Sequence, residues 1–305
     1  MRTIAKAGRE DLAMVYIAEM DDKKIEFVES IQPPLTREEK WVLIVSTMYG
    51  CPVNCRFCDA GGCYKGKLSE EEILFQIDYL VRKRFPDGSI PVKKFKIQFA
   101  RMGEPSLNQN VLGVLDKLPE IYDAPGLIPS LSTVAPRGTD GFFERLLEIK
   151  ERYSNFQLQF SIHTTDENLR DWLIPVKKWS FEEMAEYGST FYTGGRKITL
   201  NFALADGMPI DPDMLLGHFN PDIFLVKITP VNPTYNAARN GISPLDIHDD
   251  VVGSLRNAGY ETILSIGEME ENQIGSNCGQ YVMTHRKAKK SIDGGYTYDL
   301  KEIED

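Results

Sequence analysis

Short apolar runs alternate with longer segments of helical periodicity from residue 41 onward. The strand-like runs cover residues 42–46, 94–99, 127–131, 156–162, 197–203 and 223–228. The helix-like segments lie between them, at residues 69–83, 108–120, 140–152, 167–187, 211–218 and 244–258. Six strand–helix units in succession predict a parallel sheet with right-handed crossovers, which is typical of α/β barrels.

The first forty residues follow a different pattern. Residues 12–19 and 24–30 alternate as two strands do, with a polar turn between them, and Pro33-Pro34 then interrupts regular structure. We therefore expect a small N-terminal β-hairpin cap over residues 1–40. Residues 41–282 would form the main domain, and residues 283–305 a C-terminal tail.

Three cysteines follow the first strand of the main domain with the spacing Cys-x3-Cys-x2-Cys: Cys51, Cys55 and Cys58. A cubane iron–sulfur cluster normally takes four thiolates, so three leave one iron open for S-adenosyl-L-methionine (SAM). The triplet resembles the radical SAM signature. A zinc site with Cys63 as fourth ligand is the alternative, but zinc modules usually bring their thiols as two separated pairs.

Further polar residues follow the predicted strands. These residues are Gly103, Glu104, Ser132, Ser161, His163 and Asn232. Active groups of parallel α/β barrels gather at the carboxyl ends of strands, so these side chains should meet the cysteines there. Glu104 could accept hydrogen bonds from the ammonium group of SAM. Each residue also has a structural alternative: a turn, a backbone contact or a buried imidazole.

Composition narrows the class of protein. The 305 residues carry a formal net charge of −10, which disfavours a large RNA partner, and the only dense basic run is residues 286–290. Five cysteines do not make a disulfide framework, so we expect a reducing, cytoplasmic setting. The N-terminus lacks the apolar core of a signal peptide, and no stretch approaches membrane-spanning length.

Taken together, these motifs resemble the RlmN/Cfr class of radical SAM methyltransferases. The resemblance runs from about residue 12 to residue 282. Its pieces are residues 50–58, 102–108, 131–133, 160–163, 168–175, 230–233 and 278–280. It implies a partial (β/α)6 barrel of the radical SAM type, preceded by the β cap.

The resemblance also assigns roles. Cys51, Cys55 and Cys58 would ligate a [4Fe-4S] cluster, and the six polar residues at the strand ends would contact SAM. Cys278 matches the cysteine that the family methylates with one SAM. A radical from a second SAM then abstracts hydrogen from that methyl group, and the carbon radical adds to an RNA adenosine. Glu26 is the nearest match to the family's general base.

Three departures from the family change the expected substrate. Ile44 stands where the family has a second cysteine, which resolves the covalent adduct. Only residues 1–40 precede the barrel, in place of the family's RNA-binding domain. The net charge is negative, whereas an RNA methyltransferase should carry a basic surface. We therefore expect a small-molecule, nucleotide or peptide substrate, with flavodoxin or ferredoxin as electron donor. The alternatives are a non-methylating hydrogen-abstraction enzyme, an RNA adenosine C2 methyltransferase, and an iron–sulfur or zinc sensor module.

Overall fold

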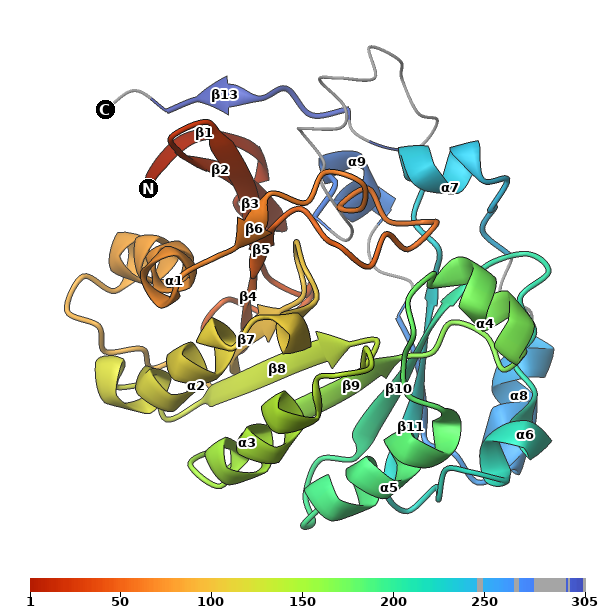
Figure 1. Ribbon diagram of the computed structural model, residues 1–305. Coiled ribbons are helices and arrows are strands. Elements are labelled where there is room, and N and C mark those ends of the chain that lie inside the picture. The colour runs from red at the N-terminus through yellow and green to blue at the C-terminus, as the bar shows by residue number, and fades with distance from the viewer. Residues whose placement is uncertain (246–248, 266–268, 277–294, 296, 304–305) are drawn as a thin grey trace.

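One sheet runs through the computed structural model, which describes residues 1–245, 249–265, 269–276, 295 and 297–303 (Figure 1). Its eleven strands lie in the order β12-β11-β10-β9-β8-β7-β4-β3-β2-β1-β13. The parallel strands are β4 (Trp41–Val45), β7 (Phe95–Phe99), β8 (Leu127–Thr133), β9 (Gln157–Ser161), β10 (Ile198–Leu204), β11 (Phe224–Pro230) and β12 (Thr262–Leu264). All six predicted strands of the main domain are confirmed, and the parallel strands have the order expected of a partial barrel.

The N-terminal strands are antiparallel and join the same sheet. They are β1 (Arg2–Arg9), β2 (Ala13–Met20) and β3 (Lys23–Ser30), and β3 pairs with β4. The predicted hairpin is therefore β2–β3, whereas β1 was not predicted. Strand β13 (Lys301–Glu302) pairs with β1, and β5 (Met48–Tyr49) and β6 (Gly66–Lys67) form a separate small ribbon.

Helices α1, α2, α3 and α5 lie along one side of the parallel strands (Figure 1). The helices are α1 (Glu70–Arg84), α2 (Asn110–Ile121), α3 (Asp140–Lys150), α4 (Glu167–Leu173), α5 (Phe181–Phe191), α6 (Pro212–Leu216), α7 (Tyr235–Arg239), α8 (Asp249–Asn257) and α9 (Met269–Ile274), with a 3-10 turn at Pro105–Leu107. At α1, the Ser69 hydroxyl accepts from the Glu72 amide while the Glu72 carboxylate accepts from the Ser69 amide, as the acidic start predicted.

The single helix expected over residues 167–187 was wrong, because the structure has two helices there. Helix α4 ends at Leu173, and its C-cap Ile174 directly precedes Pro175, which cannot continue a helix. Ser180 then starts α5 with a second reciprocal cap, in which its hydroxyl accepts from the Glu183 amide.

The two faces of the parallel strands differ in chemistry. On β7, the outward residues Phe95, Ile97 and Phe99 are fully buried in the main hydrophobic core. Each such side chain stabilises the fold by roughly 1.5–3 kcal/mol. Lys96 and Gln98 alternate with them, are half-buried and face the inside of the barrel. None of the helices in the described ranges combines the length and apolar character needed to cross a bilayer.

Candidate active site

The loop that carries the three cysteines is held in place by its own backbone. The amides of Thr47 and Met48 donate to the Met102 carbonyl at 2.7 and 3.1 Å, which ties the start of the loop to the end of β7. The Cys51 amide donates to the Ala60 carbonyl at 2.7 Å, which closes the loop on itself. Gly50 has φ +76°, and a Cβ there would lie 2.4 Å from a carbonyl oxygen, so the position requires glycine.

Helix α7 clamps the same loop from outside, through contacts that the sequence did not reveal. The backbone amides of Tyr235 and Asn236 donate to the Asp59 carboxylate at 3.0 and 2.9 Å. The Asn236 side-chain amide donates to the Cys58 carbonyl at 2.8 Å, and the Thr234 hydroxyl donates to the Phe57 carbonyl at 2.6 Å. The only sequence signal for this contact was a carboxylate, Asp59, directly after the last cysteine of the triplet.

The three thiols lie close to one another and are half-buried, whereas Cys63 is exposed. Burial raises the pKa of Cys51 to about 11 and that of Cys55 well above its usual range, and the charges of Cys51 and Cys58 raise the Cys55 pKa further. Three thiolates so placed need a cationic partner. The donor set therefore fits an iron–sulfur cluster.

The zinc alternative fits less well. In the described residues, no group of three or more Cys, His, Asp or Glu side chains is arranged to hold a single metal ion. A zinc ion would bring every thiolate to about 2.3 Å of one point. Each cysteine of a cubane binds a different iron, so a wider spacing of the sulfur atoms is compatible with a cluster.

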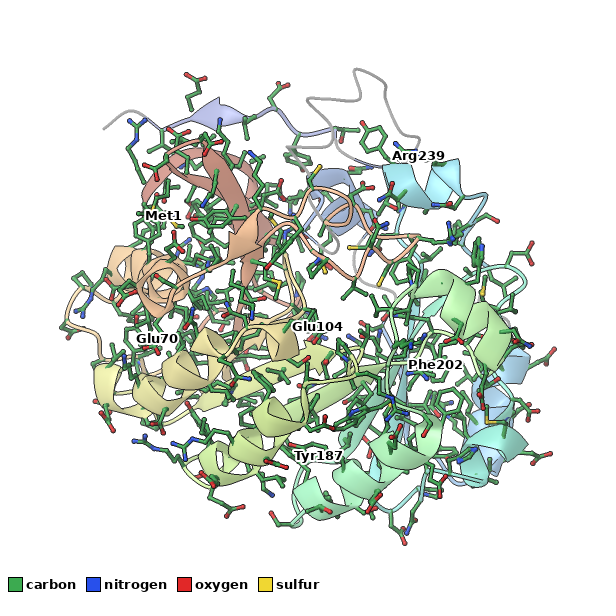
Figure 2. All side chains as sticks on the ribbon, in the orientation of Figure 1. Met1, Glu70, Glu104, Tyr187, Phe202 and Arg239 are labelled. Atoms are coloured by element: carbon green, nitrogen blue, oxygen red, sulfur yellow. The ribbon has the colours of Figure 1, made fainter. Side chains whose placement is uncertain are left out.

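Glu104 lies at the carboxyl end of the strands, near the centre of the molecule (Figure 2). It is 4% exposed and its carboxylate is fixed by hydrogen bonds. Oε1 accepts from the Ser106 amide at 3.1 Å, the Ser106 hydroxyl at 2.8 Å and the Thr133 hydroxyl at 2.5 Å, and Oε2 accepts from the Val134 amide at 2.9 Å. Burial raises the Glu104 pKa, which the hydrogen bonds oppose. Oε2 accepts only one of these bonds, so it keeps capacity for a further donor.

Gly103 packs closely against the start of the cysteine loop. Its φ is +102°, and a Cβ at this position would lie 2.7 Å from the Met48 side chain and from Thr47 Oγ1. Its amide also lowers the Cys51 pKa by hydrogen bonding, although burial outweighs that effect. The structure therefore brings Gly103 beside the cysteine loop, as the sequence predicted, and explains why glycine is needed.

Ser132 and Ser161 lie at the ends of neighbouring strands β8 and β9. The Ser132 hydroxyl is buried and has no hydrogen-bond partner among the residues that the structure describes. A buried polar group of this kind normally has a partner, so a bound ligand is a good explanation. Ser161 pairs in register with Asn201 of β10. The SAM-contact role of both serines stays a prediction, and Asn232 lies half-buried just beyond the end of β11.

His163 is 5% exposed and adopts φ +69°. Its Nδ1 accepts from the Ala203 amide at 3.0 Å, which places the ring proton on Nε2. Burial, together with the nearby Arg170 charge, lowers the pKa of His163 to about 3, so the imidazole is neutral near pH 7. The ring of Phe57, from the cysteine loop, packs edge-on against it at 4.8 Å.

Glu26 lies on β3, and its carboxylate forms a buried ion pair with Arg101 at 2.7 Å. Arg101 also donates to the carbonyls of Gly275 and Ser276, at 2.8 and 3.0 Å. This arrangement gives Glu26 a structural role, and its predicted role as general base stays a prediction. Cys278 lies outside the described residues, two positions beyond Ser276.

Ile44, at the position of the family's second cysteine, pairs in register with Val28. Its side chain is on the inner face of the sheet and is half-buried. Cys63 is exposed on the far part of the cysteine loop. No thiol of the described residues therefore occupies the place of the resolving cysteine.

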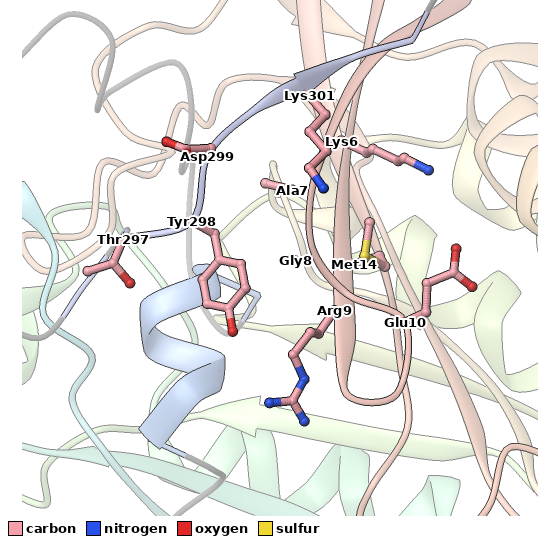
Figure 3. A pocket seen from close by; sticks show the side chains of 10 residues that line it. All are labelled: Lys6, Ala7, Gly8, Arg9, Glu10, Met14, Thr297, Tyr298, Asp299 and Lys301. Atoms are coloured by element: carbon pink, nitrogen blue, oxygen red, sulfur yellow. The ribbon is translucent and has the colours of Figure 1, made fainter.

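A pocket of about 530 Å³ lies elsewhere, between β1 and residues 297–301 (Figure 3). Two of its lining residues, Arg9 and Tyr298, contact α9. Arg9 pairs with Glu270 at 2.7 Å and with Asp11 at 2.8 Å, and the Tyr298 hydroxyl also donates to Glu270. These contacts give the pocket a structural role in fastening α9 to β1.

Comparison with known proteins gives sequence relatives and a structural relative, whereas no family model matches the chain. Over 250 residues, the chain is 28% identical to "Probable dual-specificity RNA methyltransferase RlmN" of Desulfitobacterium hafniense, covering 79% of the chain and 67% of that protein. The protein of the same name from Nostoc is 30% identical over 219 residues, covering 70% and 56%. The chain thus spans about two thirds or less of these relatives' length.

Among solved structures, a radical SAM methyltransferase from Sphaerobacter thermophilus superposes with a TM-score of 0.68 at 20% identity, covering 92% of this chain and 80% of that one. This likeness confirms the predicted fold. Membership of the radical SAM superfamily implies a [4Fe-4S] cluster and SAM as cofactors, as the cysteine triplet predicted. The chain is therefore a methyltransferase-like enzyme of the radical SAM superfamily and a distant homologue of the RlmN proteins.

Proposed function

We propose that this enzyme methylates an unactivated carbon of a small-molecule, nucleotide or peptide substrate, with Cys278 as methyl carrier. The observation that carries the proposal is the contact of Arg101 with the carbonyls of Gly275 and Ser276. Arg101 follows β7 directly and precedes Gly103 and Glu104, so it ties the segment before Cys278 to the edge of the sheet that holds the cysteine loop.

When bound, a [4Fe-4S] cluster would provide the one-electron reducing chemistry that reductive cleavage of SAM requires. Cys51, Cys55 and Cys58 would hold it, and Asp59 would keep their loop closed against α7. We propose flavodoxin or ferredoxin as the source of the electron.

The residues at the strand ends would bind and orient SAM. Glu104 Oε2 would accept a hydrogen bond from the SAM ammonium group, because Oε1 already accepts three bonds. Ser132 and Ser161 would donate hydroxyl hydrogen bonds, and His163 would donate from Nε2. Gly103, which follows β7, would contact SAM through its backbone. Asn232, which follows β11, would contact SAM through its side-chain amide.

RNA is disfavoured as substrate although the relatives are named as RNA methyltransferases. The net charge of −10 opposes binding of a polyanion. If the enzyme were an RNA adenosine C2 methyltransferase, it would bind RNA with an affinity that falls as salt rises. The acidic composition does not support such binding. Nitrocellulose filter binding at two salt concentrations would measure it.

A second function, radical hydrogen abstraction without methyl transfer, is favoured by Ile44. Release of a covalent adduct needs a second thiol, and Ile44 cannot provide one. Under this alternative, Cys278 carries no methyl group. The enzyme would then form 5′-deoxyadenosine without S-adenosylhomocysteine, which is the by-product of methyl transfer.

One anaerobic experiment separates these functions. The reconstituted enzyme would be incubated with SAM, a reductant and a cell metabolite extract, followed by mass spectrometry of the small molecules and of the peptide that contains Cys278. Methyl transfer predicts both SAM products and a methyl increment on Cys278. The Cys278→Ala variant should still yield 5′-deoxyadenosine but no methylated product. An unmodified Cys278 in an enzyme that methylates would contradict the carrier role.

A further inference from the structure

We propose that the inner face of the barrel binds an anionic group, a phosphate or a carboxylate, of the substrate through Lys96 and Ser130. This inference deepens the proposed function, because it names a chemical group of the substrate. It rests on the proposed function only where it concerns the reaction of that substrate. The anion site can be tested without it.

The register of the strands shows which side chains share the inner face. Lys96 pairs with Val42 of β4 and Ile128 of β8, and Gln98 pairs with Ser130. In-register side chains of parallel neighbours point to the same face. Since Phe95, Ile97 and Phe99 pack outward under the helices, Lys96, Gln98 and Ser130 lie together inside.

The inner face carries two cations along β4 and β7 through β11, Lys96 and Lys227. Lys227 of β11 lies on this face because it pairs in register with Asn201 of β10, and Asn201 pairs with Ser161 of β9. The other inner positions of these strands carry neutral residues. Lys96 and Lys227 thus place positive charge on the inner face of a chain with a net charge of −10, and positive charge attracts anions.

The pKa of Lys96 reflects these surroundings. Burial, together with the positive charges of Lys227, Lys40 and Arg196, lowers its pKa to about 7. Lys40 and Arg196 precede β4 and β10, at the amino ends of the strands. No described residue forms a hydrogen bond or ion pair with the Lys96 ammonium group. A buried cation in such surroundings is stabilised when an anion binds beside it.

Unsatisfied hydroxyl groups give an independent indication of a ligand. The hydroxyls of Ser130 and Thr229 are buried, and neither has a hydrogen-bond partner among the described residues. Ser130 is 1% exposed and lies one pleat from Lys96 on the neighbouring strand. Thr229 lies one pleat from Lys227 on β11. Hydroxyl and ammonium donors on one face of the sheet suit the oxygen atoms of a phosphate or carboxylate.

The position argues that this anion does not belong to SAM. Lys96 lies three residues before the end of β7. At about 3.3 Å per residue, this places Lys96 about 10 Å from the carboxyl end of the strand. The predicted SAM contacts lie at or beyond the strand ends. A substrate with its anionic group at Lys96 would extend its reacting carbon toward Glu104 and the cysteine loop.

Calorimetric titration of the reconstituted enzyme with inorganic phosphate, and separately with succinate, tests the site. Saturable binding of one or both is expected, and the anion that binds more tightly identifies the group. Lys96→Met should weaken binding about tenfold or more, Ser130→Ala should weaken it less, and Lys96→Arg should retain it. Lys117→Met, which removes an exposed cation from α2, is the matched control and should change nothing.

Three outcomes would overturn the proposal: no saturable binding of either anion, equal binding by Lys96→Met and wild type, or an equal loss of SAM affinity in Lys96→Met. The last would assign Lys96 to SAM. Formation of 5′-deoxyadenosine from SAM alone is measured in parallel. Its absence from the wild type would count against the proposed function, whereas the anion titration would still decide the site.

Discussion

The Glu26 carboxylate lies 2.7 Å from the Arg101 guanidinium, and both side chains are at most 1% exposed. The pair joins β3 to the end of β7, and Arg101 extends it to the carbonyls of Gly275 and Ser276. It is thus a link between the antiparallel strands, the strand-end edge of the barrel and the segment that precedes Cys278.

Breaking this pair should be costly. Arg101→Met removes the cation that pairs with the buried Glu26 carboxylate, so we expect a loss of about 3–5 kcal/mol in the free energy of unfolding, measured by denaturant titration. Arg2→Met breaks the exposed Arg2–Glu19 pair and should cost at most about 1 kcal/mol. Equal costs for the two variants would show that the buried pair has no special role.

The carboxylate of Asp59 should control retention of the cluster. Asp59→Ala removes the acceptor of the Tyr235 and Asn236 amides, so the cysteine loop loses its clamp on α7. We expect a lower iron content after anaerobic reconstitution with the circular dichroism spectrum preserved. Asp140→Ala, at the exposed start of α3, is the control. Full iron content in Asp59→Ala would argue that the loop closes without this contact.

His163 should make stability depend on pH. Its pKa is about 3 in the folded chain and about 6.5 when unfolded, so between these values the unfolded state binds one more proton. The contribution is full above pH 6.5 and is lost as pH falls toward 3, with a slope of up to about 1.4 kcal/mol per pH unit. His163→Asn, which tolerates positive φ, should flatten the stability curve between pH 4 and 6. An unchanged slope would indicate that the imidazole is not held neutral.

Much of the fold followed from local patterns. Six of the seven parallel strands are each a short apolar run that the sequence predicted, and Ser69 with its three following glutamates marks the start of α1. The sequence also contains signals for the break within residues 167–187, namely Pro175 and the capping pair Ser180 and Glu183. The prediction of one helix followed the overall periodicity and overlooked them. Strand β1 was missed because Arg2, Lys6 and Arg9 interrupt its apolar positions.

The sequence indicated candidate site residues but not the contacts that hold them in place. Spacing and strand ends brought Cys51, Glu104 and Ser132 to one edge. The pairing of Glu26 with Arg101 and the clamp of Asn236 on the cysteine loop join residues 75 and 178 positions apart. Such contacts depend on how distant strands pack, so no local pattern could have indicated them.

The thiols of the triplet should differ sharply from Cys63. Cys55→Ala should abolish cluster assembly, because half-buried Cys55 lies among the other two thiols. Cys63→Ala should retain a full iron content, measured by colorimetric iron and sulfide analysis. Loss of metal in both variants would instead favour a four-thiol zinc site.

The central claim is most directly tested by assaying SAM cleavage in the anaerobically reconstituted enzyme with a chemical reductant, by chromatography of the products. The account predicts 5′-deoxyadenosine from the wild type and from Cys63→Ala, and none from Cys58→Ala. Stoichiometric zinc with intact SAM in the wild type would contradict it.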